Sequence, residues 1–179
     1  MKSIFRPEPQ SGYGSILLSN SDDWSRMAAL NFERQGATWK SLNFEFYNDE
    51  KRKKSEPDIA VVVPGVAVRK ELAEKIFFDV LDDIEILPIS VSGQAWVLAN
   101  CLVSTRGMDL KKSFYHRDPS GRIFLIQKMF VNDPELSSKL AFTIDGSNRS
   151  TVFVLERFVQ RVHELGLQGI KFKAVGEVC

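Results

Sequence analysis

The stretch from Thr151 to Val175 constrains the fold more than any other part of the chain, because its apolar pattern changes period twice. Val152 to Val154 form a short apolar run, the length of a buried strand. Five apolar residues then recur at helical spacing: Leu155, Phe158, Val159, Val162 and Leu165. After Gly166, a favourable residue for ending a helix, the period falls to two, with Ile170, Phe172 and Ala174 on one face and Lys171 and Lys173 on the other. The pattern predicts a strand, a helix and a strand, with the helix covering one sheet face.

A similar apolar pattern occurs upstream, where residues 66–76 match residues 152–162. Each segment is followed by a strand-like run, Ile84 to Val91 in one case and Ile170 to Val175 in the other. We therefore predict an α+β fold in a single domain, with a mixed or antiparallel sheet and two main amphipathic helices from two similar strand–helix–strand units. The alternative is that any two amphipathic helices after a Val-rich strand look alike.

The length of 179 residues favours one domain with a sizeable core. We expect residues 32–179 to form the main domain and residues 1–31, which we leave unassigned, to pack on it. The first fourteen residues hold two prolines and two glycines, so their start is expected to be loose. The net charge of +1 creates no global field that would draw the chain to nucleic acid or anionic lipid.

The two cysteines, Cys101 and Cys179, are too few for a disulfide framework. Cys101 lies in an apolar run and is expected to be a buried thiol, which fits a reducing compartment. No apolar run approaches the length of a membrane span, so we expect a cytoplasmic protein with no membrane contact.

Several other segments have clear local signals. Leu42 to Tyr47 alternates apolar and polar residues and predicts a half-buried strand. Pro64-Gly65 predicts a turn. Ser92-Gly93 predicts a hairpin between 84–91 and 94–103, and the second strand is apolar on both faces, so we place it inside a sheet. Residues 118–121 predict a polar turn between two further strands.

The sequence contains no complete catalytic motif that we recognise. His116-Arg117-Asp118 has the letters of a kinase catalytic loop, but Ile123 stands where that loop needs a metal-binding asparagine. His116 and His163 are the only histidines and lie far apart, so we expect no metal site. Burial would keep the Cys101 thiol inert. We therefore expect no catalytic residues and no cofactor; a small metal-dependent hydrolase using Asp109 or Asp118 remains an alternative.

Two charged segments invite a functional interpretation. The basic run Lys51 to Lys54 lacks interleaved aromatics and lies among acidic residues, so we interpret it as a solvated loop and not as a nucleic-acid site. Four acids crowd the end of the predicted helix at 66–80: Asp79, Asp82, Asp83 and Glu85. Acids at a helix C-terminus oppose the macrodipole, and either a binding surface or simple solvation explains them.

Landmarks along the chain, taken together, carry a family resemblance. They are Phe32, Gly36 and Trp39; the charged loop 48–54 that leads to Pro57-Asp58; Val66-Ala-Val68; Glu85 in Ile84–Pro88; Asp109 and Ser113; Ser120–Ile123; and Val152-Phe-Val154, Arg157-Phe158, Gly166-Leu-Gln-Gly169 and Phe172. In this order and spacing the chain resembles immunity-protein family eleven of bacterial polymorphic toxin systems. Departures are Arg106, where the family tends to have an Asp, and Arg69 and Leu155, where it often has a helix-capping Ser.

The resemblance implies a cytoplasmic protein that binds a cognate toxin and occludes it. Such toxins are often nucleases delivered by type VI secretion or a similar route. A nuclease cleft is basic, so we expect Asp79, Asp82, Asp83 and Glu85 to form an acidic patch that mimics phosphate. Trp24 and Tyr47 are the aromatic residues that we expect to anchor the interface. A secretion adaptor or chaperone for the same effector is the second alternative.

Overall fold

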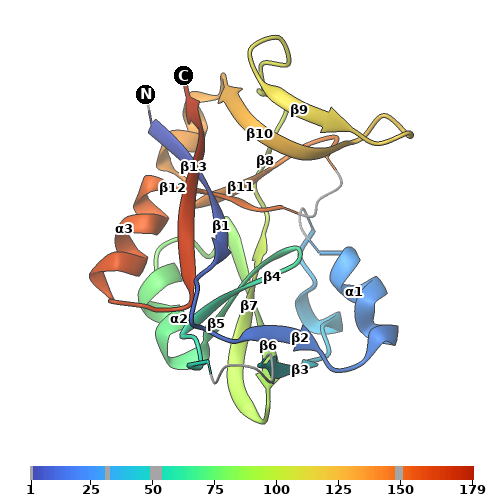
Figure 1. Cartoon of the computed structure of the whole chain (residues 1–179), viewed down its shortest axis with the longest axis vertical. Coiled ribbons are helices and arrows are strands. Elements are labelled where there is room, and N and C mark those ends of the chain that lie inside the picture. The colour runs from blue at the N-terminus through green and yellow to red at the C-terminus, as the bar shows by residue number, and fades with distance from the viewer. Residues whose placement is uncertain (1, 31–32, 49–53, 148–150) are drawn as a thin grey trace.

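The computed structural model describes residues 2–30, 33–48, 54–147 and 151–179. Its strands are β1 (Lys2–Pro9), β2 (Ser15–Leu18), β3 (Leu42–Tyr47), β4 (Ile59–Val62), β5 (Gly65–Arg69), β6 (Ile84–Val91), β7 (Gln94–Cys101), β8 (Ser104–Thr105), β9 (Phe114–Arg117), β10 (Ile123–Val131), β11 (Ala141–Ile144), β12 (Phe153–Leu155) and β13 (Ile170–Val178). Its α-helices are α1 (Trp24–Ala28), α2 (Lys70–Phe77) and α3 (Glu156–Glu164), and short 3-10 turns occupy 21–23, 36–38 and 134–138. The fold is α+β and rich in strands (Figure 1).

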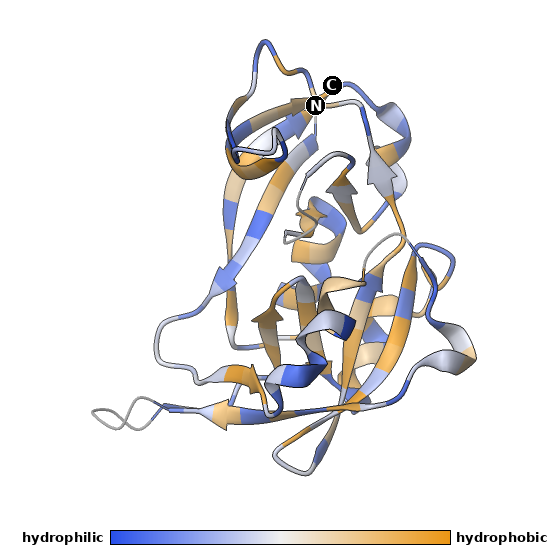
Figure 2. Ribbon diagram, turned by 90° about the vertical axis from the view of Figure 1, so that its right-hand side faces the viewer, coloured by the Kyte–Doolittle hydropathy of each residue, from blue (hydrophilic) through white to orange (hydrophobic). Residues whose placement is uncertain are grey.

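The strands form two mixed sheets. The seven-stranded sheet has the order β8-β11-β12-β1-β13-β10-β9, and the six-stranded sheet has the order β2-β3-β6-β7-β5-β4. β7 lies between β5 and β6, as its two apolar faces predicted. The predicted strand at Leu42–Tyr47 and the turns at Pro64-Gly65, Ser92-Gly93 and 118–121 are also confirmed. In Figure 2 apolar residues follow the strands, while the connecting segments are mainly hydrophilic.

The stretch from Thr151 to Val175 forms β12, α3 and the first part of β13, as predicted. α3 ends because Gly166 adopts a φ of +64° and the amide of Leu167 donates to the carbonyl of Val162 at 3.1 Å, which satisfies an orphan helix carbonyl. The strand alternation differs from the prediction at one point: Ala174 is exposed and Val175 is buried. A register shift opposite this point, between Ile4 and Phe5 of β1, inserts a β-bulge that reverses the alternation.

The expectation of a loose N-terminal start is wrong, because β1 lies between β12 and β13 inside the seven-stranded sheet. The amide of Gln10 donates to the carbonyl of Gly169 at 3.0 Å. Successive residues of a strand direct their backbone nitrogens to opposite sides. The nitrogens of Pro7 and Pro9, which carry no hydrogen, therefore face away from β13. β12 pairs only with Ile4 and Phe5, so no ladder bond is lost at either proline.

Two strand–helix–strand units occur with the same topology. In the first unit, β5, α2 and β6 surround β7, which runs antiparallel to both strands; in the second unit, β12, α3 and β13 surround β1 in the same way. The match extends outward: β4, β3 and β2 have the order and directions of β11, β10 and β9. The six-stranded sheet and six strands of the larger sheet thus have one plan.

The registers of the two units also correspond. Arg69 pairs with Trp96 as Leu155 pairs with Ile4, and the next pair inward matches as well. β6 turns into β7 through Ser92-Gly93, with φ angles of 47° and 80° that suit a tight hairpin. At the same place in the second unit the two chain ends lie side by side (Figure 1), because Lys2 pairs with Val178.

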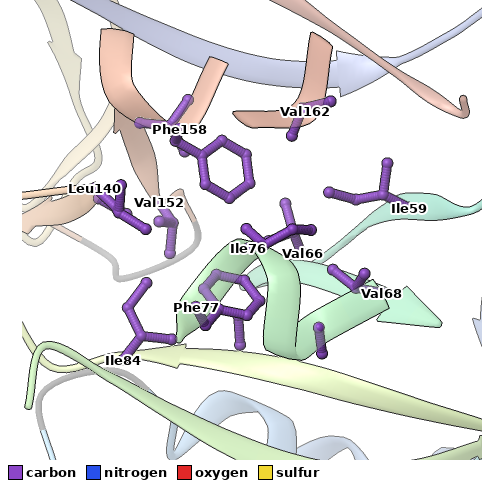
Figure 3. Packing of buried hydrophobic residues seen from close by; sticks show 14 of the residues in the cluster. Ile59, Val66, Val68, Ile76, Phe77, Ile84, Leu140, Val152, Phe158 and Val162 are labelled. Atoms are coloured by element: carbon purple, nitrogen blue, oxygen red, sulfur yellow. The ribbon is translucent and has the colours of Figure 1, made fainter. Parts of the chain in front are cut away.

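A shared core joins the two units (Figure 3). Phe158 and Val162 of α3 meet Ile76 and Phe77 of α2, and the rings of Phe77 and Phe158 have centroids 6.3 Å apart. All four side chains are at most 1% exposed. The other face of each sheet has its own apolar cluster, one of which contains Met27 of α1. Burial of each large side chain contributes about 1.5–3 kcal/mol, so this central layer holds the domain together.

A circular permutant tests the correspondence of the units. We expect a chain that joins Cys179 to Lys2 through a short glycine-serine linker and opens between Ser92 and Gly93 to fold cooperatively, because a hairpin then forms where the ends already lie side by side. Its free energy of unfolding, measured in urea, should fall by at most about 2 kcal/mol. A control opened between Leu98 and Ala99, inside buried β7, should not fold. Failure of the first permutant to fold would contradict the correspondence.

Candidate functional site

The acidic segment after α2 is the predicted site, and the structure gives most of its carboxylates a role within the fold. Asp79 Oδ2 accepts hydrogen bonds from Arg157 and, at 2.7 Å, from Nη2 of Arg161. Arg161 also donates to the carbonyl of Ile76 in the last turn of α2. The acid that opposed the macrodipole is therefore compensated by two cations of α3, which join the helices of the two units.

The same contacts set the titration of Asp79. The hydrogen bond from Arg161 lowers the pKa of the Asp79 carboxyl below its ordinary value, against the opposing effect of burial. The positive charges of Arg161 and Arg157 act in the same direction. Asp79 thus stays ionised at neutral pH as part of an internal ion pair.

Glu85, the second residue of β6, anchors the loop that precedes β3. Its carboxylate accepts the backbone amides of Gln35 at 2.8 Å and Gly36 at 2.9 Å, and Nδ2 of Asn100 at 2.9 Å. Burial acts to raise the pKa of the Glu85 carboxyl, but the Gln35 and Gly36 amides and Asn100 outweigh it and hold that pKa below its ordinary value. The loop at 33–36 therefore depends on a charged Glu85.

The other two acids differ from each other. Asp83 pairs with Nζ of Lys139 at 2.8 Å, and its side chain is 19% exposed. Asp82 is exposed, and among the residues that the structure describes its carboxylate has no partner. Three of the four predicted acids thus bind groups of their own chain, and Asp82 is the one whose carboxylate has no partner among the described residues.

The two predicted aromatic anchors are exposed but lie elsewhere. Trp24 is 54% and Tyr47 is 55% exposed. Trp24 lies on α1, whose Met27 packs on the opposite face of the six-stranded sheet from α2. Tyr47 ends β3, which runs parallel to β6, so it lies roughly 30 Å along the sheet from the acids. The structure does not bring the six predicted residues into one site.

An apolar groove beside α2 was not predicted. Its volume is about 400 Å³, and its lining residues are Lys70, Ala73, Glu74, Phe77, Phe78, Leu81, Ile86 and Val97. Phe78 is 67% and Leu81 is 54% exposed at its rim, although one side of the Phe78 ring lies 4.9 Å from the guanidinium carbon of Arg161. Asp82 follows directly in sequence. An apolar floor, two exposed apolar side chains and a charged rim form one surface here, which we call the α2 groove.

The second unit shows why this groove is open. By register, Ile86 and Val97 correspond to Phe172 and Phe5. Phe172 packs edge-on against Phe158, with centroids 6.0 Å apart, and against His163, with centroids 5.8 Å apart. Two phenylalanines fill the space in the second unit, whereas the smaller Ile86 and Val97 leave it empty in the first.

The sequence held a signal for the groove. α2 buries Ala73, Ile76 and Phe77, so the next residue, Phe78, falls off the buried face. Leu81 lies beyond the helix and directly precedes Asp82 and Asp83. A large apolar residue directly after the buried face of a helix indicates an exposed contact surface, so the helical period could have identified Phe78 but not the hollow beside it.

The other candidate residues have local roles. Asp109 accepts the amides of Lys111 and Lys112, and Asp118 accepts the Ser120 hydroxyl at 2.6 Å, so both carboxylates stabilise turns. Burial raises the pKa of the Cys101 thiol to about 12, as expected for an inert thiol. Within 2–30, 33–48, 54–147 and 151–179, no group of three or more His, Cys, Asp or Glu is placed to hold a metal ion.

No protein-family model matches the chain. A search of curated proteins also finds no match. The resemblance to immunity-protein family eleven therefore stays a prediction from the residues that carry it. Of these, Phe32 and the charged loop at 49–53 lie outside the described residues, as does most of the basic run Lys51–Lys54. None of the described helices is long and apolar enough to cross a membrane.

The role of Glu85 predicts a pH-dependent effect. Because its folded-state pKa is below its ordinary value of 4.5, the charged form stabilises the fold above pH 4.5, and this stability is lost as pH falls through the lower folded-state value. Glu85→Gln should lower the free energy of unfolding by about 1–3 kcal/mol at pH 7, and the difference from wild type should shrink below pH 4.5. Urea titrations across this range measure both values.

Glu45→Gln is the matched control for that measurement. Glu45 is exposed on β3, so its neutralisation should change the free energy of unfolding by no more than about 0.5 kcal/mol. A Glu85→Gln effect that is equally large at pH 3.5 and pH 7 would show that charge is not what holds the loop.

Proposed function

We propose that the protein is an immunity protein that binds a cognate antibacterial toxin and neutralises it by occlusion, using the α2 groove as its contact surface. The observation that carries the proposal is the exposure of Phe78 and Leu81 beside an apolar hollow. The family resemblance supports the nature of the partner, a toxin and foremost a nuclease. The role needs no catalytic group, since occlusion works by covering the partner's site.

The α2 groove has the composition of an interaction hot spot. Binding energy in protein interfaces concentrates in a few large side chains that fill pockets, surrounded by polar groups that exclude water. Phe78 and Leu81 are such side chains, and Lys70 and Glu74 are charged groups in the same lining. A protruding apolar side chain of the partner would enter the hollow between α2 and the β6–β7 strands.

The acidic patch takes a different form in this proposal from the one expected. Asp82 offers an uncompensated carboxylate next to Leu81, where it would meet a cation of a basic nuclease cleft. Asp79, Asp83 and Glu85 act through the fold, because their internal partners hold the segment after α2 in place. Reversing all four charges would therefore disturb the fold as well as the surface.

Truncating the rim of the groove tests the proposal. We expect Phe78→Ala combined with Leu81→Ala to weaken binding of the toxin at least about 30-fold, because two hot-spot side chains are lost, and to abolish growth rescue. The toxin is sought as the product of the neighbouring gene that kills when expressed alone. Growth on co-expression, co-elution on a sizing column and calorimetry give the three readouts.

Matched controls keep that experiment specific. Trp24→Ala and Tyr47→Ala remove equally exposed aromatics at distant places and should leave affinity unchanged. A loss of affinity only in these variants would move the interface to the sites expected from the sequence. Wild-type complex formation without growth rescue would assign the adaptor role instead. If the protein neither restores growth nor co-elutes with a toxic neighbour, the proposed function is overturned.

Filling the groove is a complementary test. Ile86→Phe with Val97→Phe copies the residues of the second unit, so the hollow should close without a large loss of stability. We expect the variant to keep the wild-type circular dichroism spectrum and to bind the toxin at least about 10-fold more weakly. Unchanged affinity in a folded variant would mean that the partner does not enter the groove.

A further inference from the structure

The hairpin of β9 and β10, with the segment that leads into it, carries a local excess of positive charge. Residues 106–128 hold six basic residues against two acids: Arg106, Lys111, Lys112, Arg117, Arg122 and Lys128 against Asp109 and Asp118. This segment has a net charge of +4 in a chain of net +1, so the remainder carries −3. The overall charge therefore conceals a cationic region.

The two acids of this region face their own turns. Asp109 accepts two backbone amides, and Asp118 accepts the Arg122 amide at 2.9 Å and the Ser120 hydroxyl. The hydrogen bond from the Lys112 amide is the main cause that lowers the pKa of Asp109, and the one from Ser120 has the same effect on the pKa of Asp118. All six basic residues are exposed, although Nζ of Lys112 lies 3.7 Å from Asp109 and Arg106 pairs with Asp145.

Aromatic rings lie among these cations. Tyr115 packs inward against an apolar cluster, so its neighbours Phe114 and His116 point outward from the strand. Phe114 is 64% and Phe124 is 47% exposed, and the rings of His116 and Phe124 have centroids 6.2 Å apart. β9 is the last strand of its sheet, so the described chain does not cover this hairpin from beyond β9. Arg117 lies on the inward side with Tyr115, since its guanidinium carbon is 5.2 Å from the centre of that ring. We call the other exposed residues of the segment, Lys111, Lys112, Arg122 and Lys128 with Phe114, His116 and Phe124, the basic hairpin surface.

A small hollow opens next to the same hairpin. Its volume is about 170 Å³, and it is lined by Arg106, Met108, Leu110, Arg117, Ile123, Ile144, Asp145 and Gly146. Arg106 and Arg117 are both exposed or at the rim, and the apolar residues form the interior. Arg106 donates to the carboxylate of Asp145 at 2.5 Å within this lining, whereas Arg117 has no carboxylate partner among the described residues and can meet an anionic backbone.

We propose that the basic hairpin surface binds single-stranded nucleic acid, with phosphates on the cations and bases stacked on the exposed rings. Unspecific single-strand binders combine a positive track with aromatic side chains in this way. Bases present a flat face to each ring and phosphates a charge to each cation, so a nucleic acid would use both features of this surface along one strand. The expectation of no nucleic-acid contact rested on the net charge and on residues 51–54, and neither reflects this surface. The inference is independent of the proposed function.

Fluorescence anisotropy with labelled 20-nucleotide oligo-dT and oligo-U tests the proposal. The wild-type protein should bind, and the affinity should fall about 20-fold between 50 and 200 mM NaCl if about three phosphates are contacted. Phe114→Ala with Phe124→Ala should weaken binding at least 10-fold and leave the salt slope unchanged, because stacking is lost but charge is not. Lys111→Gln with Arg122→Gln and Lys128→Gln should weaken binding and flatten the slope.

Controls remove the same chemistry elsewhere. Trp24→Ala takes away an exposed ring of the other unit, and Lys40→Gln with Lys75→Gln takes away two exposed charges of that unit. Both variants should bind as wild type. Absence of binding at 50 mM NaCl overturns the proposal. If the phenylalanine variant binds the oligonucleotides with wild-type affinity, the surface binds anions in general and the proposal is overturned. If poly-glutamate binds as tightly as the oligonucleotides and is weakened equally by loss of the two rings, the partner is an acidic protein and the proposal is also overturned.

Discussion

The packing of α2 against α3 is the constraint on which the rest of the structure depends. Phe158 and Val162 from one helix and Ile76 and Phe77 from the other close the core between the two units. Arg161 links the same helices at their surface by binding both Asp79 and the carbonyl of Ile76. Since each sheet presents one face to this layer, neither unit could bury its inner face without the other.

The candidate site follows from a difference between two otherwise similar units. Where the second unit places Phe5 and Phe172, the first places Val97 and Ile86, and the α2 groove is the space that results. Three of the acids near the groove, Asp79, Asp83 and Glu85, form hydrogen bonds or ion pairs within the chain, and the Asp82 carboxylate remains at the surface. The proposed contact surface thus lies where smaller side chains replace the phenylalanines of a packing plan that both units share.

The sequence predicted those features that depend on near neighbours. The periods within 151–175 identified β12, α3 and β13, and the two apolar faces of 94–101 placed β7 inside a sheet. Features that depend on distant partners were missed. β1 looked loose because two prolines obscure a strand that needs donors on one side only, and Asp79 looked misplaced because its partner Arg161 lies 82 residues away. The α2 groove requires a comparison of side-chain size between units that only the register reveals.

The position of β1 also has a consequence for the order of folding. The first unit, from β2 to β7, is contiguous in the chain and can pair its strands as soon as residue 101 has been made. β1 is made before every other strand, yet its neighbours β12 and β13 are among the last. Its apolar residues Ile4 and Phe5 must therefore wait through most of synthesis, and closing that loop of about 150 residues is the entropically slow step. In the order of synthesis the second unit is therefore completed after the first, so the inner face of the early half is available to the late half when its strands come together.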